Sequence, residues 1–155
     1  MKIGVREADL SKRDERSFVA DAFVRSICSS RRYDSVSNGV AMNRWRRIFD
    51  WLAETATVVI AVRDDDPTKF VGFAIYDAEA RVIHYIYIKY AYRTRGYGSN
   101  LLRFCKNAIK AGSPAVFTVF TSAMAHLAEK WDAVVDEEKL LEPYYMPNCK
   151  SEGGA

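Results

Sequence analysis

Two glycines flanked by arginines form the segment of this sequence best suited to bind an anion. Residues 93–98 read RTRGYG, between a β-rich run and a stretch with helical spacing. The first N–H groups of a helix have no intrahelical partner and lie at the positive end of its dipole. Gly96 and Gly98 lack the Cβ that would keep phosphate oxygens away, and Arg93 and Arg95 add charge. The segment therefore predicts a pyrophosphate site.

The spacing of these glycines excludes two common nucleotide-binding motifs. A Rossmann turn requires GxGxxG, and a P-loop requires GxxxxGK followed by Ser or Thr. Neither pattern occurs at residues 93–98. The anion site predicted here is therefore of another kind.

The bulk composition predicts one ordinary globular domain. The chain has 155 residues, of which 49% are hydrophobic and 28% charged, with a formal net charge of +3. This small excess of positive charge does not indicate a nucleic-acid binder. We assign residues 1–150 to a single domain and residues 151–155 to a flexible tail.

The sequence predicts neither a metal site nor a membrane anchor. Cys28, Cys105 and Cys149 are widely spaced and lack a zinc-ligand pattern, so we expect reduced thiols. The aspartates at 64–66 fit a turn better than a calcium loop. No apolar stretch of about 18 residues and no leader-like segment is found, which favours a cytoplasmic protein.

Apolar periodicity predicts alternating helices and strands that surround this segment. The strands expected cover residues 3–5, 57–62, 70–76, 81–88, 115–120, 133–135 and 140–146. The helices expected begin with a cap at Ser11, span 43–52, follow Gly98 and begin with a cap at Ser122. Residues 57–62 and 70–76 are expected to form an antiparallel hairpin.

The pattern Arg93-x-x-Gly96-x-Gly98 after Ile86-x-Ile88 resembles the acetyl-CoA-binding motif of the GNAT superfamily of N-acetyltransferases. There, a strand with hydrophobic-x-hydrophobic spacing precedes Q/R-x-x-G-x-G/A, and the element order here matches over nearly the whole chain. The resemblance implies an α/β (α+β) fold with a mixed, mostly antiparallel sheet of roughly six or seven strands and about four helices. The fourth and fifth strands are expected to splay apart.

The resemblance also implies where acetyl-CoA binds. The pantetheine arm would lie between the splayed strands, and backbone N–H groups near Ile88 would stabilise the oxyanion of the reaction. The residues assigned to the cofactor are Ile86, Tyr87, Ile88, Arg93, Thr94, Arg95, Gly96, Tyr97, Gly98 and Ser99. The implied reaction is direct transfer of the acetyl group to a primary amine.

A base is required because a primary amine, with a pKa of about 10.4, is mostly protonated at neutral pH. His84 is the candidate, since even spacing from Ile86 and Ile88 places it on their face of the strand. Arylalkylamine acetyltransferases of this superfamily have histidine at a similar place. A histidine that only packs in the core is the alternative interpretation.

The general acid of this superfamily is commonly a tyrosine on the helix after the fifth strand, where this sequence has Ala128. We name Tyr144 as the replacement, and Tyr85, Tyr87 and Tyr145 stay open.

Two other classes of function stay open. The absent tyrosine favours a catalytically weak or inactive GNAT-fold binding or structural protein. An arginine-rich helix face at Arg44, Arg46 and Arg47 would suit a nucleic acid, although a solvated face explains it better. The acceptor amine is not specified, and pairing of exposed edge strands would give a homodimer.

Overall fold

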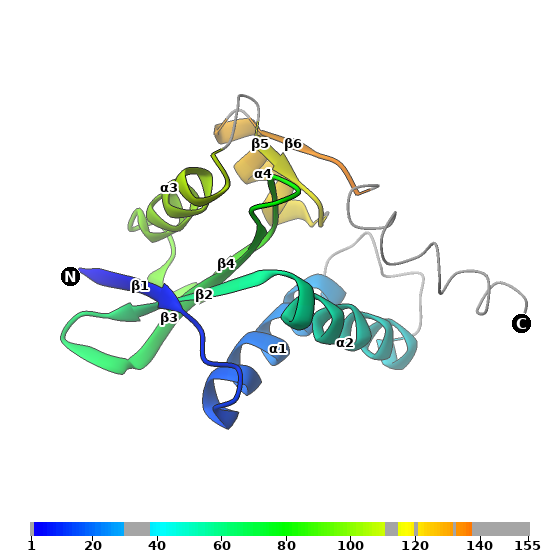
Figure 1. Cartoon of the computed structure of the whole chain (residues 1–155), viewed down its shortest axis with the longest axis horizontal. Coiled ribbons are helices and arrows are strands. Elements are labelled where there is room, and N and C mark those ends of the chain that lie inside the picture. The colour runs from blue at the N-terminus through cyan, green and yellow to red at the C-terminus, as the bar shows by residue number, and fades with distance from the viewer. Residues whose placement is uncertain (1, 30–37, 111–114, 120, 132, 138–155) are drawn as a thin grey trace, which may run out of the picture.

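The computed structural model describes residues 2–29, 38–110, 115–119, 121–131 and 133–137, which form one six-stranded sheet flanked by helices (Figure 1). The strands are β1 (Ile3–Glu7), β2 (Thr57–Arg63), β3 (Asp66–Asp77), β4 (Val82–Ile88), β5 (Ala115–Phe117) and β6 (Ala133–Val135). The helices are α1 (Arg13–Cys28), α2 (Asn38–Thr55), α3 (Tyr97–Ile109) and α4 (Ser122–Lys130).

The sheet order is β1-β2-β3-β4-β5-β6, antiparallel from β1 to β4 and parallel from β4 to β6. Helices α1 and α2 lie on one side of the sheet, and α3 and α4 lie on the other (Figure 1). The predicted mixed, mostly antiparallel fold is confirmed. The strand expected at 140–146 lies outside the described residues.

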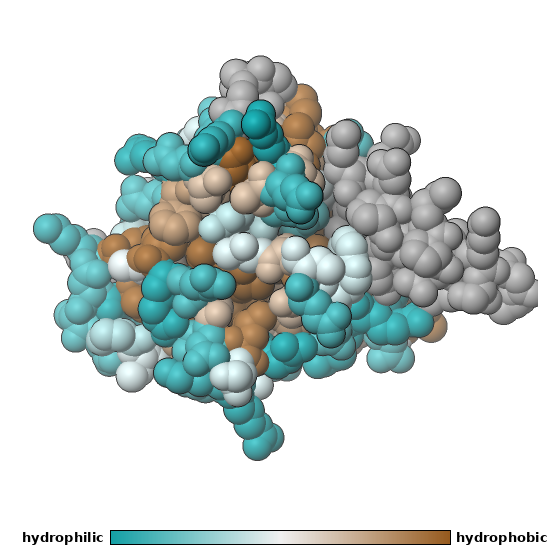
Figure 2. Space-filling view, viewed as in Figure 1, coloured by the Kyte–Doolittle hydropathy of each residue, from teal (hydrophilic) through white to brown (hydrophobic). Residues whose placement is uncertain are grey.

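The core forms where the helices pack on the sheet. Its largest fully buried side chains come from α1, α2, α3 and the strands, with Phe23, Phe49, Phe73 and Phe117 among them. In the space-filling view, apolar side chains show through the middle of one face and polar side chains surround them (Figure 2). Burial of this kind supplies most of the stability of a domain.

The hairpin of β2 and β3 is confirmed, and so is its aspartate-rich turn. Asp66 Oδ1 accepts hydrogen bonds from the backbone N and the Oγ1 of Thr68, at 3.1 and 2.6 Å. The side chains of Arg63 and Asp65 form an ion pair. Among the described residues, no group of three or more His, Cys, Asp or Glu side chains is placed to hold a metal ion.

Both predicted helix caps were wrong. The residue before α1 is Lys12, which makes no side-chain cap, because Ser11 bonds to Asp9 instead. The cap of α4 is Thr121, one residue earlier than expected, and its Oγ1 accepts from the N–H of Met124 at 3.1 Å. A cap needs an extended backbone and an oxygen within reach of the third N–H, and only the folded chain decides which neighbour satisfies both.

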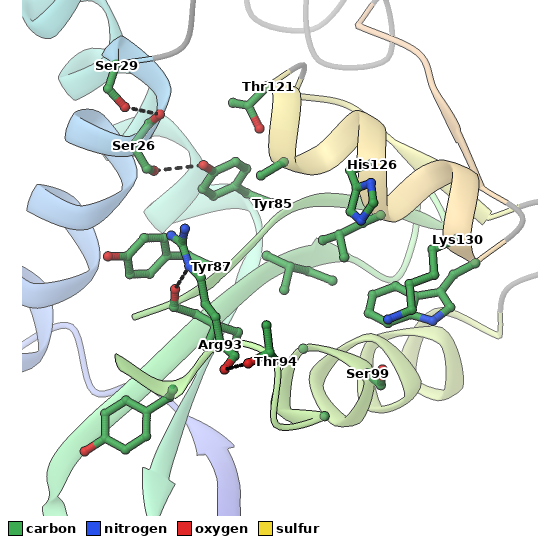
Figure 3. A pocket seen from close by; sticks show the side chains of 18 residues that line it. Ser26, Ser29, Tyr85, Tyr87, Arg93, Thr94, Ser99, Thr121, His126 and Lys130 are labelled. Atoms are coloured by element: carbon green, nitrogen blue, oxygen red, sulfur yellow. Dashed lines mark hydrogen bonds between the residues drawn. The ribbon is translucent and has the colours of Figure 1, made fainter. Parts of the chain in front are cut away.

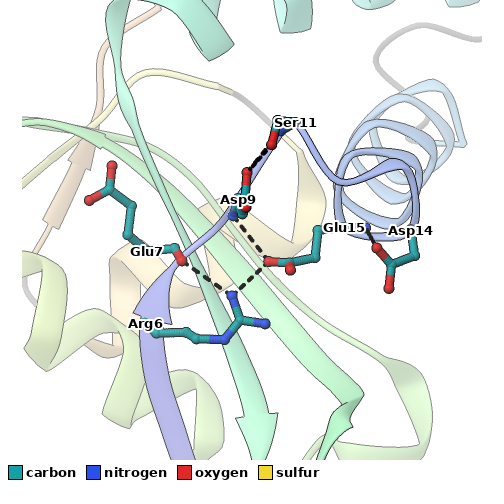
Figure 4. A network of polar contacts seen from close by, with 6 residues as sticks. All are labelled: Arg6, Glu7, Asp9, Ser11, Asp14 and Glu15. Carbon is teal, nitrogen blue, oxygen red and sulfur yellow. Dashed lines mark hydrogen bonds and ion pairs between the residues drawn. The ribbon is translucent and has the colours of Figure 1, made fainter.

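A buried carboxylate joins β1 to the start of α1 (Figure 4). Glu15 Oε1 accepts from Arg6 Nη1 at 2.7 Å and from the backbone N of Asp9 at 3.1 Å. The hydrogen bond from Arg6 is the main reason that the pKa of Glu15 lies below its ordinary value. The network ties the first turn of α1 to β1 and to the segment that joins them.

Two exposed ion pairs join α1 and α2. Arg46 pairs with Asp21 of α1 at 3.4 Å, and Arg16 of α1 pairs with Asp50 of α2 at 2.9 Å. Such exposed pairs contribute little stability each, but they account for part of this charged face without a nucleic acid.

Within the described residues, Cys28 and Cys105 are free cysteines, and Cys149 lies outside them. None of the helices described is both long and apolar enough to span a bilayer.

The fourth strand separates from the fifth after a single point of pairing. Ile83 pairs with Phe117, and the N–H of Thr118 donates to the carbonyl of Ile83 at 3.1 Å. On the other edge of β4, Tyr85 pairs with Ile75 of β3, and Ile83 pairs with the next residue of β3. His84, between Tyr85 and Ile83, therefore has no partner in the register of β3 and forms a β-bulge in β4. Bulges bend a strand. The predicted splay is confirmed, and the bulge lies where it begins.

Candidate active site

A cavity of about 720 Å³ follows the open edge of β4, in the size range of small-molecule sites (Figure 3). The start of α3 closes one end, the end of α1 closes the other, and α4 forms the far wall. Its lining comprises Ser26, Ser29, Tyr85, Ile86, Tyr87, Ile88, Tyr92, Arg93, Thr94, Gly96, Gly98, Ser99, Thr121, Ala123, His126, Leu127, Lys130 and Trp131.

All the residues assigned to the cofactor from the sequence line this cavity, apart from Arg95 and Tyr97. Tyr97 is buried and packs against Tyr92, with ring centres 6.3 Å apart. Arg95 is exposed outside the lining. Tyr144 lies outside the described residues, so its assignment stays a prediction.

The loop before α3 has the backbone shape of an anion cradle. Gly96 precedes the helix with φ +85° and provides no side-chain cap for the first turn. Thr94 also has a positive φ, of 64°, which is unusual for a β-branched residue. Strain of this kind collects at functional loops, and the uncapped helix start leaves N–H groups for a ligand. The predicted site thus has the required local geometry.

Arg93 ties this loop to the end of β4. Its Nε donates to the carbonyl of Ile88 at 2.9 Å, and its guanidinium lies 5.8 Å from the ring centres of Tyr87 and Tyr90. Because Nε is engaged, the terminal N–H groups of the guanidinium remain the ones that can meet a phosphate. Tyr90, beside Arg93, is 84% exposed and does not line the cavity.

The backbone of β4 presents polar groups to the cavity. The N–H of Lys89 donates to Val71 of β3 at 2.9 Å, toward the paired edge of the strand. Backbone groups alternate sides along a strand, so the N–H of Ile88 points to the opposite edge, where β5 has moved away. At this edge, the N–H of Ile88 is placed to donate a hydrogen bond to a carbonyl oxygen of a ligand in the cavity.

His84 occupies the bulge and does not line the cavity. The bulge interrupts the alternation that placed His84 on the face of Ile86 and Ile88 in the sequence. His84 is only 4% exposed, and its Nδ1 lies 2.6 Å from Oγ1 of Thr118. Burial lowers the pKa of His84 to about 4. This geometry favours a structural role at the last contact of β4 and β5, and catalysis by His84 stays a prediction.

The buried state of His84 predicts acid sensitivity. Between pH 6.5 and about 4 the native imidazole stays neutral, whereas the unfolded one is protonated, so stability is lost as the pH falls through this window. We expect a loss of up to about 3 kcal/mol from this group. Urea unfolding at pH 7 and pH 4.5 measures it, and His84→Gln should have a flatter pH dependence. If the free energy of unfolding depends on pH equally in the wild type and in His84→Gln, the buried neutral His84 is not the cause.

A chain of hydroxyl groups closes the inner end of the cavity (Figure 3). Ser26 Oγ donates to the carbonyl of Phe23 at 3.2 Å, so it accepts the 2.8 Å bond from the phenol of Tyr85. Burial raises the pKa of Tyr85, and hydrogen bonds to Ser26 and Thr121 oppose this. The phenol therefore stays protonated at neutral pH.

Several lining residues were missed from the sequence: Ser26, Ser29, Tyr92, Thr121, Ala123, His126, Leu127, Lys130 and Trp131. Those of α4 recur at helical spacing, which is a signal, but the same pattern describes any face of a helix. Ala128, at the place of the expected tyrosine, is buried and lies outside the lining.

Comparison with known proteins identifies the family. The model of the acetyltransferase (GNAT) domain matches residues 54–132, just over half of the chain. A sequence search of curated proteins finds no match. The protein is thus an acyltransferase-type α/β domain with a cavity beside a glycine loop. It belongs to the GNAT acetyltransferase family, whose members use acetyl-CoA.

Solved structures share this fold at low sequence identity. YjaB of Escherichia coli, in its apo form, has a TM-score of 0.58 at 16% identity, covering 84% of this chain and 81% of its own. A GCN5-related N-acetyltransferase of Rhodopseudomonas palustris has a TM-score of 0.57 at 18% identity, covering 84% of this chain and 81% of its own. PH1933 of Pyrococcus horikoshii has a TM-score of 0.53 at 17% sequence identity, covering 83% of this chain and 87% of its own.

Proposed function

We propose that this protein transfers the acetyl group of acetyl-CoA directly to a primary amine. One observation carries the proposal: the cavity runs without interruption from the glycine loop along the unpaired edge of β4 to the hydroxyl groups of Ser26 and Tyr85. An elongated, partly apolar cavity with an anion cradle at one end suits an acyl carrier that ends in phosphates.

The residues present fit acetyl-CoA, which supplies an activated acetyl thioester when bound. A Cβ placed on Gly98 would meet nothing closer than Ile88 and Trp131, both at 3.8 Å, so this position is open space beside the cradle. The uncapped start of α3 and Arg93 would hold the pyrophosphate. The backbone N–H of Ile88 would hold the acetyl carbonyl or the pantetheine amide.

Of the two histidines in the chain, His126 is the one that lines the cavity. We propose it as the group that accepts the proton of the amine, with the sequence-predicted His84 as the competing candidate. His126→Gln is expected to lower kcat roughly 100-fold with little change in acetyl-CoA binding, because general-base catalysis contributes on this scale. His84→Gln should mainly lower stability. The pH dependence of kcat in both variants shows which histidine acts as the base. An unchanged kcat in His126→Gln would contradict the assignment.

Direct transfer predicts that no acetyl group becomes attached to the protein. Burial raises the pKa of the Cys105 thiol to about 12 and also raises that of Cys28, so neither thiol is an activated nucleophile. Cys28→Ser should therefore keep full activity. Mass spectrometry after incubation with acetyl-CoA alone should show the unmodified mass, and a stoichiometric acetyl adduct would contradict direct transfer.

Calorimetry tests the proposed donor. We expect acetyl-CoA and desulfo-CoA to bind with comparable affinity, because the cradle and strand edge do not depend on the sulfur. A screen of amines, including peptide N-termini, lysine peptides, polyamines and aminoglycosides, then seeks the acceptor. Absence of CoA binding would refute the proposal.

The second candidate function is a GNAT-fold binding or structural protein. The observation that favours it is Ala128, which stands where the family commonly has a tyrosine that acts as the general acid. CoA binding without turnover on any amine would be its signature. A cytoplasmic location and a homodimer remain proposals from the sequence.

A further inference from the structure

The charged side chains that line the large cavity in the described part of the chain are basic. Arg93 follows β4, and Lys130 lies on α4, one helical turn after the proposed base His126 (Figure 3). Among the residues that the structure describes, no aspartate or glutamate belongs to the lining. A ligand that enters this cavity therefore meets positive charge and no described negative charge.

Carboxylates on the helices around the cavity lie outside its lining. Glu129, the only carboxylate of α4, is exposed and does not line the cavity. On α1, the buried Glu15 accepts a hydrogen bond from Arg6. Asp21, also on α1, pairs with Arg46 of α2 at 3.4 Å. These carboxylates therefore do not serve as counter-charges for an ammonium group inside the cavity.

Hydroxyl groups line the cavity where α1 ends, on Ser26, Ser29 and the phenol of Tyr85. Tyr85 donates to Ser26 at 2.8 Å, and Ser26 donates to the carbonyl of Phe23 at 3.2 Å. These groups are uncharged. Burying a charge without a counter-charge costs far more free energy than burying a neutral polar group. This end of the cavity therefore suits an amine in its neutral form.

Biological amines differ widely in how much neutral form they contain at pH 7. The α-amine of a peptide has a pKa of about 7.7–8.0, whereas the amine of a lysine side chain has a pKa of about 10.4. Roughly a tenth of the α-amine is neutral at this pH, against about 0.04% of the lysine amine, a ratio of about 300. A polyamine would also bring further ammonium groups toward Lys130, and like charges repel.

We propose that the acceptor of this protein is a weakly basic amine, the α-amine of a peptide, in preference to lysine side chains and polyamines. The inference rests on the proposed acetyl transfer and names its acceptor. Attack by the neutral nitrogen on the acetyl carbonyl forms the C–N bond and breaks the C–S bond. His126 accepts the proton that the nitrogen loses, and solvent supplies one to the departing sulfur. An imidazole can do this for an amine that is already close to neutral.

Two versions of one peptide test the preference. The first has a free N-terminus and an acetylated lysine, and the second has an acetylated N-terminus and a free lysine. With acetyl-CoA at pH 7, we expect kcat/KM to be roughly 30-fold or more higher for the first peptide, and spermidine to react no faster than the second. Mass spectrometry locates the new acetyl group. Equal or faster acetylation of the lysine peptide or of spermidine would overturn the inference and leave acetyl transfer in place. No acetylation of any of the three would refute the proposed function itself.

A change of charge on the cavity wall tests the electrostatic cause. Lys130→Glu places a carboxylate there, so KM for spermidine and for the lysine peptide should fall about fivefold, while the α-amine peptide changes less. Arg44→Glu is the matched control, because Arg44 is an exposed residue of α2 that does not line the cavity. The control should keep the wild-type preference. A wild-type preference in Lys130→Glu as well would show that the charge of the cavity does not select the acceptor.

Discussion

Replacement of Gly98 by aspartate is expected to weaken acetyl-CoA binding roughly 100-fold or more, without lowering stability. The new carboxylate would stand in the open space beside Ile88 and Trp131, where the pyrophosphate is expected. It would also occupy the first turn of α3, where a negative charge favours the helix, and it would replace a poor helix former. We therefore expect the free energy of unfolding to stay constant or rise by about 0.5–1 kcal/mol.

Gly39 supplies the matched control. It lies in the first turn of α2, is exposed, and has no atom within 4 Å of a Cβ built on it. Gly39→Asp introduces the same charge at the same place of another helix, on the other side of the sheet. Calorimetry should show wild-type affinity in Gly39→Asp, and thermal unfolding should show both variants folded. Equal affinity in the two variants would contradict the position of the cradle.

Replacement of Gly72 by alanine is expected to damage both stability and binding. A Cβ on Gly72 would lie 2.2 Å from the carbonyl oxygen of Tyr87 and 3.1 Å from Cα of Ile88. Because these are backbone atoms of β4, the strand itself must move. Overpacking of this kind costs about 3 kcal/mol, which lowers Tm by roughly 6–12 °C in a domain of this size. The displaced Ile88 would carry Arg93 with it and weaken acetyl-CoA binding.

Gly4→Ala is the control for this strand substitution. Its Cβ would meet the carboxylate of Asp64 at 3.1 Å, which is the movable end of an exposed side chain. We expect only a small change in Tm and no change in affinity. Calorimetry and thermal unfolding of the two alanine variants make the comparison. A Gly72→Ala protein with the Tm of wild type would show that β3 and β4 do not approach as closely as described.

Some features of this protein follow from short stretches of sequence. The hairpin of β2 and β3 and the helix after Gly98 were predicted because the alternation, turn residues and helical spacing that define them are local. The anion cradle was predicted for the same reason: its N–H groups, glycines and Arg93 lie within a few residues of each other. The family resemblance rests on that same segment together with the order of the predicted helices and strands.

Other features depend on how distant segments meet, and the sequence predicted them poorly. The bulge in β4 arises from its register with β3, and it moved His84 out of the alternation that a single strand suggests. Thr121 caps α4, and Trp131 at the end of α4 lines the cavity together with residues of β4 and of the start of α3. Spacing along one segment specifies which side chains share a face. Only tertiary structure decides what that face meets, because register and packing depend on residues far apart in the chain.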